Sequence, residues 1–102
     1  MMKLLAVVVV LVLAVPASAA AATLPYKTAI KRAERAAARQ ARKVHAVAWE
    51  ISRGFRFERH KVVFAWYGQR ADGSGCDAQL VVRYASLKSR KVVAYFRKLE
   101  CS

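Results

Sequence analysis

The chain has 102 residues, of which 19 are lysine or arginine and 6 are aspartate or glutamate, so its formal charge is +13. This length excludes a multidomain enzyme. With 57% hydrophobic residues, 4 glycines and 2 prolines, the composition also excludes a disordered basic tail and a collagen-like chain. The figures predict one small domain with a strongly cationic surface.

The first 19 residues have the pattern of a secretory signal peptide. Lys3 supplies a positive start, Leu4 to Val15 is an uninterrupted apolar run, and Ala17 to Ala19 matches an A-x-A cleavage site. The run has about 12 residues, whereas a spanning helix needs about 20, so a retained membrane anchor is the weaker alternative. Small residues allow cleavage as late as residue 22. We expect a secreted protein, extracellular, in the cell wall or in the periplasm, with one domain over residues 20–102.

The two cysteines, Cys76 and Cys101, are expected to form a disulfide. Export would place this even pair in an oxidising compartment. In the loop-entropy model, closing a loop of about 26 residues stabilises a domain by about 3 kcal/mol. Two free thiols or a metal pair are the alternatives, but two cysteines without histidines at ligand spacing make a poor zinc site. We predict no metal and no other cofactor.

The segment from Tyr26 to Val44 has the period of an amphipathic helix, with Thr23 as its expected cap and Pro25 in its first turn. Winding it on a helix gathers the apolar residues in an arc of about 140°. They are Tyr26, Ala29, Ile30, Ala33, Ala36, Ala37, Ala41 and Val44. The opposite arc is basic and is the candidate anion-binding surface. Its residues are Lys27, Lys31, Arg32, Arg35, Arg39, Arg42 and Lys43.

After the helix, the pattern alternates with period two, which is typical of strands. We expect four strands, at 47–57 with a bend or bulge at Gly54, at 61–70, at 76–85 and at 91–101, with a turn at 71–75. No crossover helices separate them, so the sheet is antiparallel. The predicted fold class is α+β, with one N-terminal amphipathic helix packed on a four-stranded antiparallel meander.

The centre of the last hairpin, near Leu87 and Lys88, predicts which residues of its two strands face each other. This register places Cys76 opposite Cys101, Leu80 and Tyr95 on the core face, and Val81 opposite Phe96 on the other face. One helix cannot cover both faces of the sheet. We therefore expect an interaction patch at Val81 and Phe96 that binds a protein partner or a second copy of the chain.

This order of elements, with a late cysteine pair, resembles the cystatin-like α+β roll. The whole chain is also similar to short, exported, Ala- and Arg-rich bacterial proteins of unknown function that carry one basic helix and a cysteine-stapled sheet. Both resemblances concern architecture, and a fold alone does not imply a function. Cystatin inhibitors carry a Q-x-V-x-G motif, whose nearest match, 79–83, lacks the glycine. No functional residue is therefore carried over.

No motif in the sequence is a catalytic signature. His60, beside Glu58 and Lys61, is predicted to lie in a polar turn, and the alternative is acid-base catalysis in a small secreted ribonuclease. His45 is expected at the end of the helix, where the helix dipole accounts for it. The leading hypothesis is a non-enzymatic module that adheres to anionic envelope or nucleic-acid polymers through the basic helix face. An inhibitor that docks through its sheet and the turn at 72–75 is the other alternative.

Overall fold

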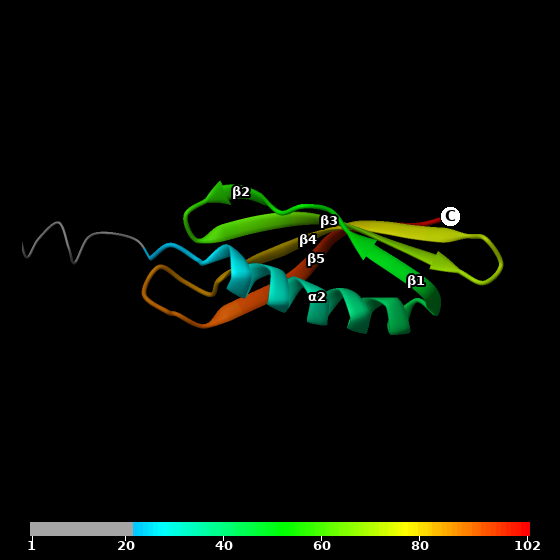
Figure 1. The fold of residues 1–102 in the computed structure, drawn as a ribbon, viewed down its shortest axis with the longest axis horizontal. Coiled ribbons are helices and arrows are strands. Elements are labelled where there is room, and N and C mark those ends of the chain that lie inside the picture. Colours follow the sequence, from blue (N-terminus) through cyan, green and yellow to red (C-terminus); the bar gives the residue numbers. More distant parts are fainter. Residues whose placement is uncertain (1–21) are drawn as a thin grey trace, which may run out of the picture.

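The computed structural model describes residues 22–102, and the expected signal peptide at 1–19 lies outside them. The described part holds one helix followed by five strands (Figure 1). In chain order they are α2 (Tyr26–Lys43), β1 (Ala46–Ile51), β2 (Phe55–Glu58), β3 (Lys61–Arg70), β4 (Gly75–Tyr84) and β5 (Val92–Cys101). A helix packed on an antiparallel sheet confirms the α+β class. Within residues 22–102, no helix is long and apolar enough to cross a membrane.

The sheet has the order β1-β3-β4-β5, and β2 pairs with β3 on the same edge as β1. The single strand expected at 47–57 is therefore wrong, and the sheet has five strands instead of four. Ser52 is still bonded to β3, since its N–H donates to the Ala65 carbonyl and its hydroxyl accepts the Ala65 N–H, both at 2.9 Å. Beyond it the chain leaves β3, and the Gly54 N–H donates to the Tyr26 hydroxyl at 2.8 Å. A Cβ atom at Gly54 would lie 2.6 Å from the Phe64 ring, so this close crossing requires glycine.

Helix α2 lies across one face of the sheet and packs on β1, β3, β4 and β5 (Figure 1). The predicted apolar stripe is confirmed at its alanines, whose small side chains let the helix lie close to the strands. The buried helix residues are Ala29, Ala33, Ala37, Gln40 and Ala41. The expected Thr23 cap is wrong, because Pro25 occupies the N-cap position and no side chain caps the helix.

Leu24, directly before the helix, is a core residue that the helical period does not reveal. Its side chain is fully buried. Its N–H donates to the Arg59 carbonyl at 2.8 Å, and its carbonyl accepts from Nη2 of Arg56 at 2.8 Å. These two bonds hold the chain extended against the β2–β3 turn. They explain why the helix begins only at Tyr26.

The C-terminal end of α2 is fixed by β3. Val44 is the C-cap residue, and its carbonyl accepts a hydrogen bond from Nε of Arg70 at 2.8 Å. His45 follows with a φ of 60°, in the left-handed conformation that commonly ends a helix. This is the location predicted for His45. The last turn contains Arg42 and Lys43, whose charges suit the negative end of the helix dipole.

The hydrophobic core fills the space between α2 and the sheet face that it covers, the inner face. Its largest buried side chains from the sheet alternate along β3 and β4, as expected for strands with one buried face. They are Val62, Phe64 and Trp66 from β3 and Leu80 and Val82 from β4. The opposite face of the sheet, the outer face, is not covered by α2.

The Cys76–Cys101 disulfide is present, and the two cysteines face each other as predicted. The predicted register does not continue along the hairpin. A little further along β4, Gln79 faces Arg97, one residue away from the partner that the cysteine pairing implies. β5 therefore contains a β-bulge, and Lys98 at that point has a φ of 54°.

The bulge exchanges the two faces of β5 over most of its length. Leu80 faces Phe96, and Val81 faces Tyr95. Phe96 consequently packs against the core, where its ring lies 5.7 Å from that of Trp66. The expected outer patch of Val81 with Phe96 is wrong. One extra residue in a strand moves every following side chain to the other face, and the hairpin centre alone did not reveal that residue.

Candidate anion-binding surface

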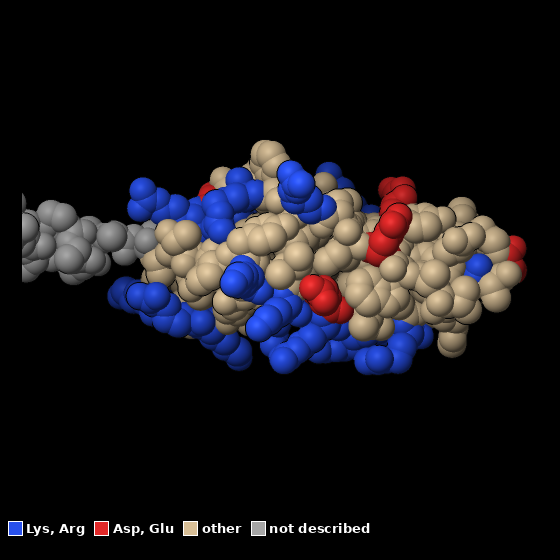
Figure 2. All heavy atoms as spheres, in the orientation of Figure 1, with Lys and Arg blue, Asp and Glu red and all other residues tan. Residues whose placement is uncertain are grey.

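The exposed side of α2 carries the candidate anion-binding residues. All seven cations that the sequence analysis singled out are exposed in the structure, on the side of the helix opposite its buried alanines. Figure 2 shows Lys and Arg side chains gathered along the rim of the molecule that α2 forms. The seven side chains are thus exposed to solvent, and the binding of an anion by them stays a prediction. We call these seven residues the basic face of α2.

Five residues of the basic face follow one another at intervals of four. They are Lys27, Lys31, Arg35, Arg39 and Lys43. With a rise of about 1.5 Å per residue, neighbours in this series lie about 6 Å apart along the axis and the series spans about 24 Å. Like charges at this spacing repel each other by a few tenths of a kcal/mol per pair. An anionic ligand that lies along these five side chains would relieve this repulsion.

Acidic side chains do not neutralise the basic face. Among residues 22–102, the structure records one acid-base pair within 4.0 Å, between Glu58 and His60, far along the chain from α2. The first helical turn contains no acid, and Lys27 stands there at the positive end of the helix dipole. Helix stability therefore does not account for a lysine at this position.

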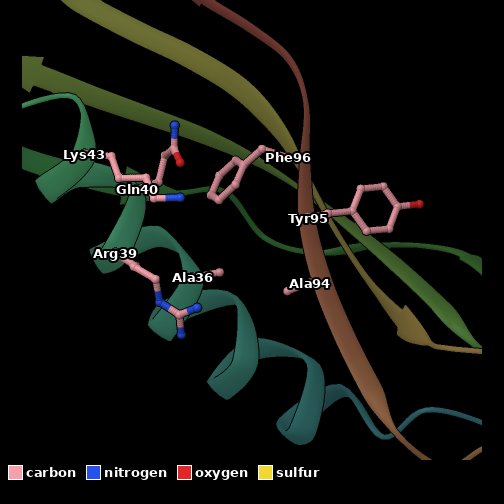
Figure 3. A pocket seen from close by; sticks show the side chains of 7 residues that line it. All are labelled: Ala36, Arg39, Gln40, Lys43, Ala94, Tyr95 and Phe96. Atoms are coloured by element: carbon pink, nitrogen blue, oxygen red, sulfur yellow. The ribbon is translucent and has the colours of Figure 1, made fainter.

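A groove separates the C-terminal half of α2 from the edge strand β5, and we call it the α2–β5 groove. It has a volume of about 320 Å³. Its lining residues are Ala36, Arg39, Gln40, Lys43, Ala94, Tyr95 and Phe96 (Figure 3). The groove thus joins two cations of the basic face to apolar and aromatic surface.

Gln40 is the polar residue that lies deepest against the core in this groove. It is 9% exposed and is the one buried polar residue of the core region among residues 22–102. Figure 3 shows its amide group in the space between the helix and Phe96, whereas the Tyr95 ring points away from that space. Burying a polar amide costs free energy unless it is hydrogen-bonded. In the sequence, this residue is visible as a glutamine among the alanines of the apolar stripe.

The two histidines lie in different turns, His45 at the end of α2, where its N–H donates to the Arg42 carbonyl at 3.3 Å, and His60 between β2 and β3. His60 is in the turn between β2 and β3, as predicted, with its Nε2 atom 3.2 Å from Oε2 of Glu58. The nearby Arg56 guanidinium is engaged in structure, because it donates to the backbone carbonyls of Arg59 and Leu24 at 2.9 and 2.8 Å. The polar turn is confirmed, and a catalytic role for Glu58 and His60 stays a prediction.

The turn between β3 and β4 is held by Asp72 and Ser74. The backbone N–H and the hydroxyl of Ser74 donate to the same oxygen of Asp72, at 2.9 and 2.6 Å. These hydrogen bonds to the carboxylate lower the pKa of Asp72. Gly73, between them, has a φ of 89°. Docking of an inhibitor through this turn stays a prediction.

Neither a metal centre nor a known relative adds to this description. Within residues 22–102, no three His, Cys, Asp or Glu side chains gather in a way that could hold a metal ion. Comparison of the chain with models of known families, with curated proteins and with solved structures finds no match. The resemblance to the cystatin-like roll therefore stays a prediction, and a function has to be argued from the residues themselves.

Proposed function

We propose that this protein is an exported binding module that holds phosphate-bearing polymers on the basic face of α2. The observation that carries the proposal is the set of seven exposed cations on one side of a single helix, without an acidic side chain within 4.0 Å among residues 22–102. Cations arranged along a phosphate chain release its condensed counterions, and this release drives binding.

The composition of the basic face favours a polymer over a lipid bilayer. Among the exposed positions from 27 to 43, Thr28 is the one uncharged residue. A helix that lies in a membrane interface needs large apolar side chains to insert beside its cations, and this surface has none. The series of five cations, about 24 Å long, instead matches a linear array of charges, since one strand of B-DNA presents a phosphate about every 3.4 Å.

Salt dependence is the measurement that tests the proposal. The oxidised protein, residues 20–102, is titrated with fluorescent single-stranded DNA, duplex DNA and polyphosphate at several salt concentrations. If five cations each neutralise one phosphate, log K against log salt should fall with a slope of about −3.5 for single strands and about −4.5 for a duplex. Affinity that does not change with salt would contradict the proposal.

A charge-matched pair of variants separates the basic face from net charge. The test variant replaces Arg35, Arg39 and Arg42 by Ala, and the control replaces Lys88, Arg90 and Lys91, which are exposed in the β4–β5 connection. Both lose three charges. Two of its three positions, Arg35 and Arg39, belong to the five aligned cations, so the test variant should make the slope shallower by about 1.4 for single strands and about 1.8 for a duplex. An equal effect of the two variants would mean that net charge, and not α2, binds the polymer.

The three ligands also identify the polymer class. Polyphosphate carries the charges without bases, so equal binding of polyphosphate and single-stranded DNA indicates recognition of phosphate alone. Stronger binding of single-stranded DNA would indicate that bases contribute, as when they stack on aromatic rings. Vesicles with anionic lipid serve as the fourth ligand, and tighter binding to them than to any polymer would reject the polymer in favour of a membrane surface.

A further inference from the structure

We propose that the outer face of the sheet binds the outer face of a second copy of this chain, with the strands of the two sheets running in opposite directions. This inference rests on the sheet and not on the basic face of α2, so it stands apart from the proposed function. It replaces the expected patch of Val81 and Phe96 with another set of outer-face residues, to which the β5 bulge adds Tyr95.

An apolar row crosses the outer face at right angles to the strands. Phe55 faces Val63, Val63 faces Val81, and Val81 faces Tyr95, so the four residues line up through β2, β3, β4 and β5. Phe55 is 65% exposed and Tyr95 37%, whereas Val81 between them is 1% exposed. The row thus has two aromatic side chains standing out at its ends. The parts of the row that another molecule can touch are therefore mainly Phe55 and Tyr95, and we call these two side chains the apolar ridge, on a face that α2 does not cover.

The neighbouring row is recessed. Ala65 faces Gln79 there, and the small alanine leaves room beside the ridge, whereas at the β5 end of the same row Gln79 faces the exposed Arg97. Two hollows that share Ala65, Trp66 and Asp77 in their linings have volumes of about 350 and 420 Å³. A ridge beside a hollow is a self-complementary shape, because the ridge of one copy can enter the hollow of another.

Charges of opposite sign flank the ridge and the hollow. On the ridge side, Lys61 faces Arg83 across β3 and β4. On the hollow side, Tyr67 faces both Glu50 and Asp77, and Asp77 faces Glu100, so three acids share one row. Half of the acidic residues of the chain lie in this row, since the sequence has 6. Apart from Arg97 in the row between them, the outer face is therefore basic at the Lys61 and Arg83 end and acidic at the Asp77 end.

This charge distribution selects the symmetry of the pair. Two copies can pack outer face to outer face around a two-fold axis that lies midway between the two sheets. This axis can run either parallel or perpendicular to the strands. The parallel axis would place basic rows on basic rows. The perpendicular axis reverses the strand direction, so that Arg83 of one copy faces Asp77 of the other and the ridge faces the hollow. Like-charge contact costs several kcal/mol, so the second arrangement is favoured.

The surroundings of Arg83 are compatible with such a contact. Its Nε atom is buried and has no hydrogen-bond partner among residues 22–102, and its guanidinium lies 5.8 Å from the centre of the Tyr95 ring. A buried donor without a partner is costly, and Nε itself is too deep for an opposing sheet to reach. The half-buried side chain carries four further N–H groups, which an opposing sheet could meet. A carboxylate from an opposing sheet is the group that suits them best.

The size of the face predicts a weak dimer. Four strands about 4.8 Å apart and four rows about 6.8 Å apart cover roughly 500 Å² on each copy. The total of roughly 1,000 Å² is at the lower limit for a specific interface, so we expect a dissociation constant in the micromolar range. In this dimer both basic faces of α2 point away from the interface, because α2 lies on the inner face of each sheet.

Sedimentation equilibrium without any polymer tests this inference, from about 1 μM to several hundred μM, a range around the expected dissociation constant. The mass of the native sequence should rise from that of one copy to that of two. The Asp77→Lys and Arg83→Glu variants should each weaken association at least about tenfold, because each places like charges opposite one another. The double variant should recover association, since it restores opposite charges in exchanged positions. Glu34→Lys, on α2, is the matched control and should dimerise like the native sequence.

Each result decides the question. A strict monomer at the highest concentration, or a double variant that associates no better than the two single ones, would overturn the inference. Asp77 is exposed, so its variant should fold normally even if Arg83→Glu is less stable, and the melting temperature of each variant establishes this. Native association that survives Asp77→Lys unchanged would place the contact elsewhere on the molecule and would equally reject this face.

Discussion

The ring of Phe96 meets the ring of Trp66 edge-on, with their centroids 5.7 Å apart and their planes at 76°. Trp66 is 1% exposed in the middle of β3, and its Nε1 atom has no hydrogen-bond partner among residues 22–102. The indole is therefore held by packing alone, and Phe96 covers it from the edge strand β5. This contact exists because the bulge at Lys98 turns Phe96 toward the core.

Truncation of Phe96 should therefore destabilise the protein more than truncation of its neighbour Tyr95. Phe96→Ala is expected to lower the free energy of unfolding by about 2 to 3 kcal/mol, somewhat less than for a fully buried ring, because Phe96 is half-buried. Tyr95→Ala, on the outer face, should lower it by less than about 1 kcal/mol. Urea denaturation measures both, at a concentration where the protein is monomeric. The reverse order of the two effects would contradict the register of β5.

Lys98 adopts a backbone conformation that suits glycine. Its φ of 54° is in the left-handed region, which costs a residue with a Cβ atom about 1 to 2 kcal/mol. Lys98→Gly should raise the free energy of unfolding by about 0.5 to 1 kcal/mol, after subtraction of the larger chain entropy of glycine in the unfolded state.

Arg97→Gly is the matched control for Lys98→Gly, because it places the same residue one position earlier in β5. That strand position has ordinary dihedral angles, so the substitution should destabilise by about 0.5 to 1 kcal/mol. Thermal unfolding of the two variants shows the opposite signs directly. If both are destabilised equally, the bulge is not at Lys98.

The sequence predicted the parts of this fold that local patterns decide. The alanine stripe of α2 has a helical period, β3 has the expected bounds of 61–70, and the turn before β4 is built from Asp72, Gly73 and Ser74. The seven cations follow from the same helical period, which places them on the side away from the alanines. Each of these features depends on residues that are close together in the chain.

The features that the sequence did not predict depend on distant residues or on an ambiguous pattern. In β5, Val92, Ala94 and Phe96 alternate with Val93 and Tyr95, so either register buries apolar side chains and the pattern cannot choose between them. The division into β1 and β2 requires the hydrogen bond from Gly54 to Tyr26, which are 28 positions apart. The α2–β5 groove likewise joins elements that are far apart in the chain.

Leu24 is expected to be as important for stability as a residue in the middle of a strand. It is fully buried and lies before the first element, where chain ends are usually loose. Leu24→Ala should lower the free energy of unfolding by about 2 to 4 kcal/mol. Thr23→Ala is the matched control and should change it by less than about 0.5 kcal/mol, because Thr23 is exposed and caps nothing. A costly Thr23→Ala would restore the capping role that the sequence predicted.

The turn at 71–75 should respond to acid through Asp72. Its pKa lies below the ordinary value of 3.8, first because the Ser74 hydroxyl donates to the carboxylate and next because the Ser74 N–H does so. A pKa that is lower in the folded than in the unfolded chain means that the ionised carboxylate stabilises the fold. This stabilisation is complete above the unfolded pKa and is lost as the pH falls through the folded pKa. Carbon NMR of the Asp72 carboxyl group should therefore give a midpoint below 3.8, and Ser74→Ala should move it up toward that value. Ser89→Ala, in the β4–β5 connection, should leave it unchanged, and a native midpoint at or above 3.8 would contradict the hydrogen bonds described here.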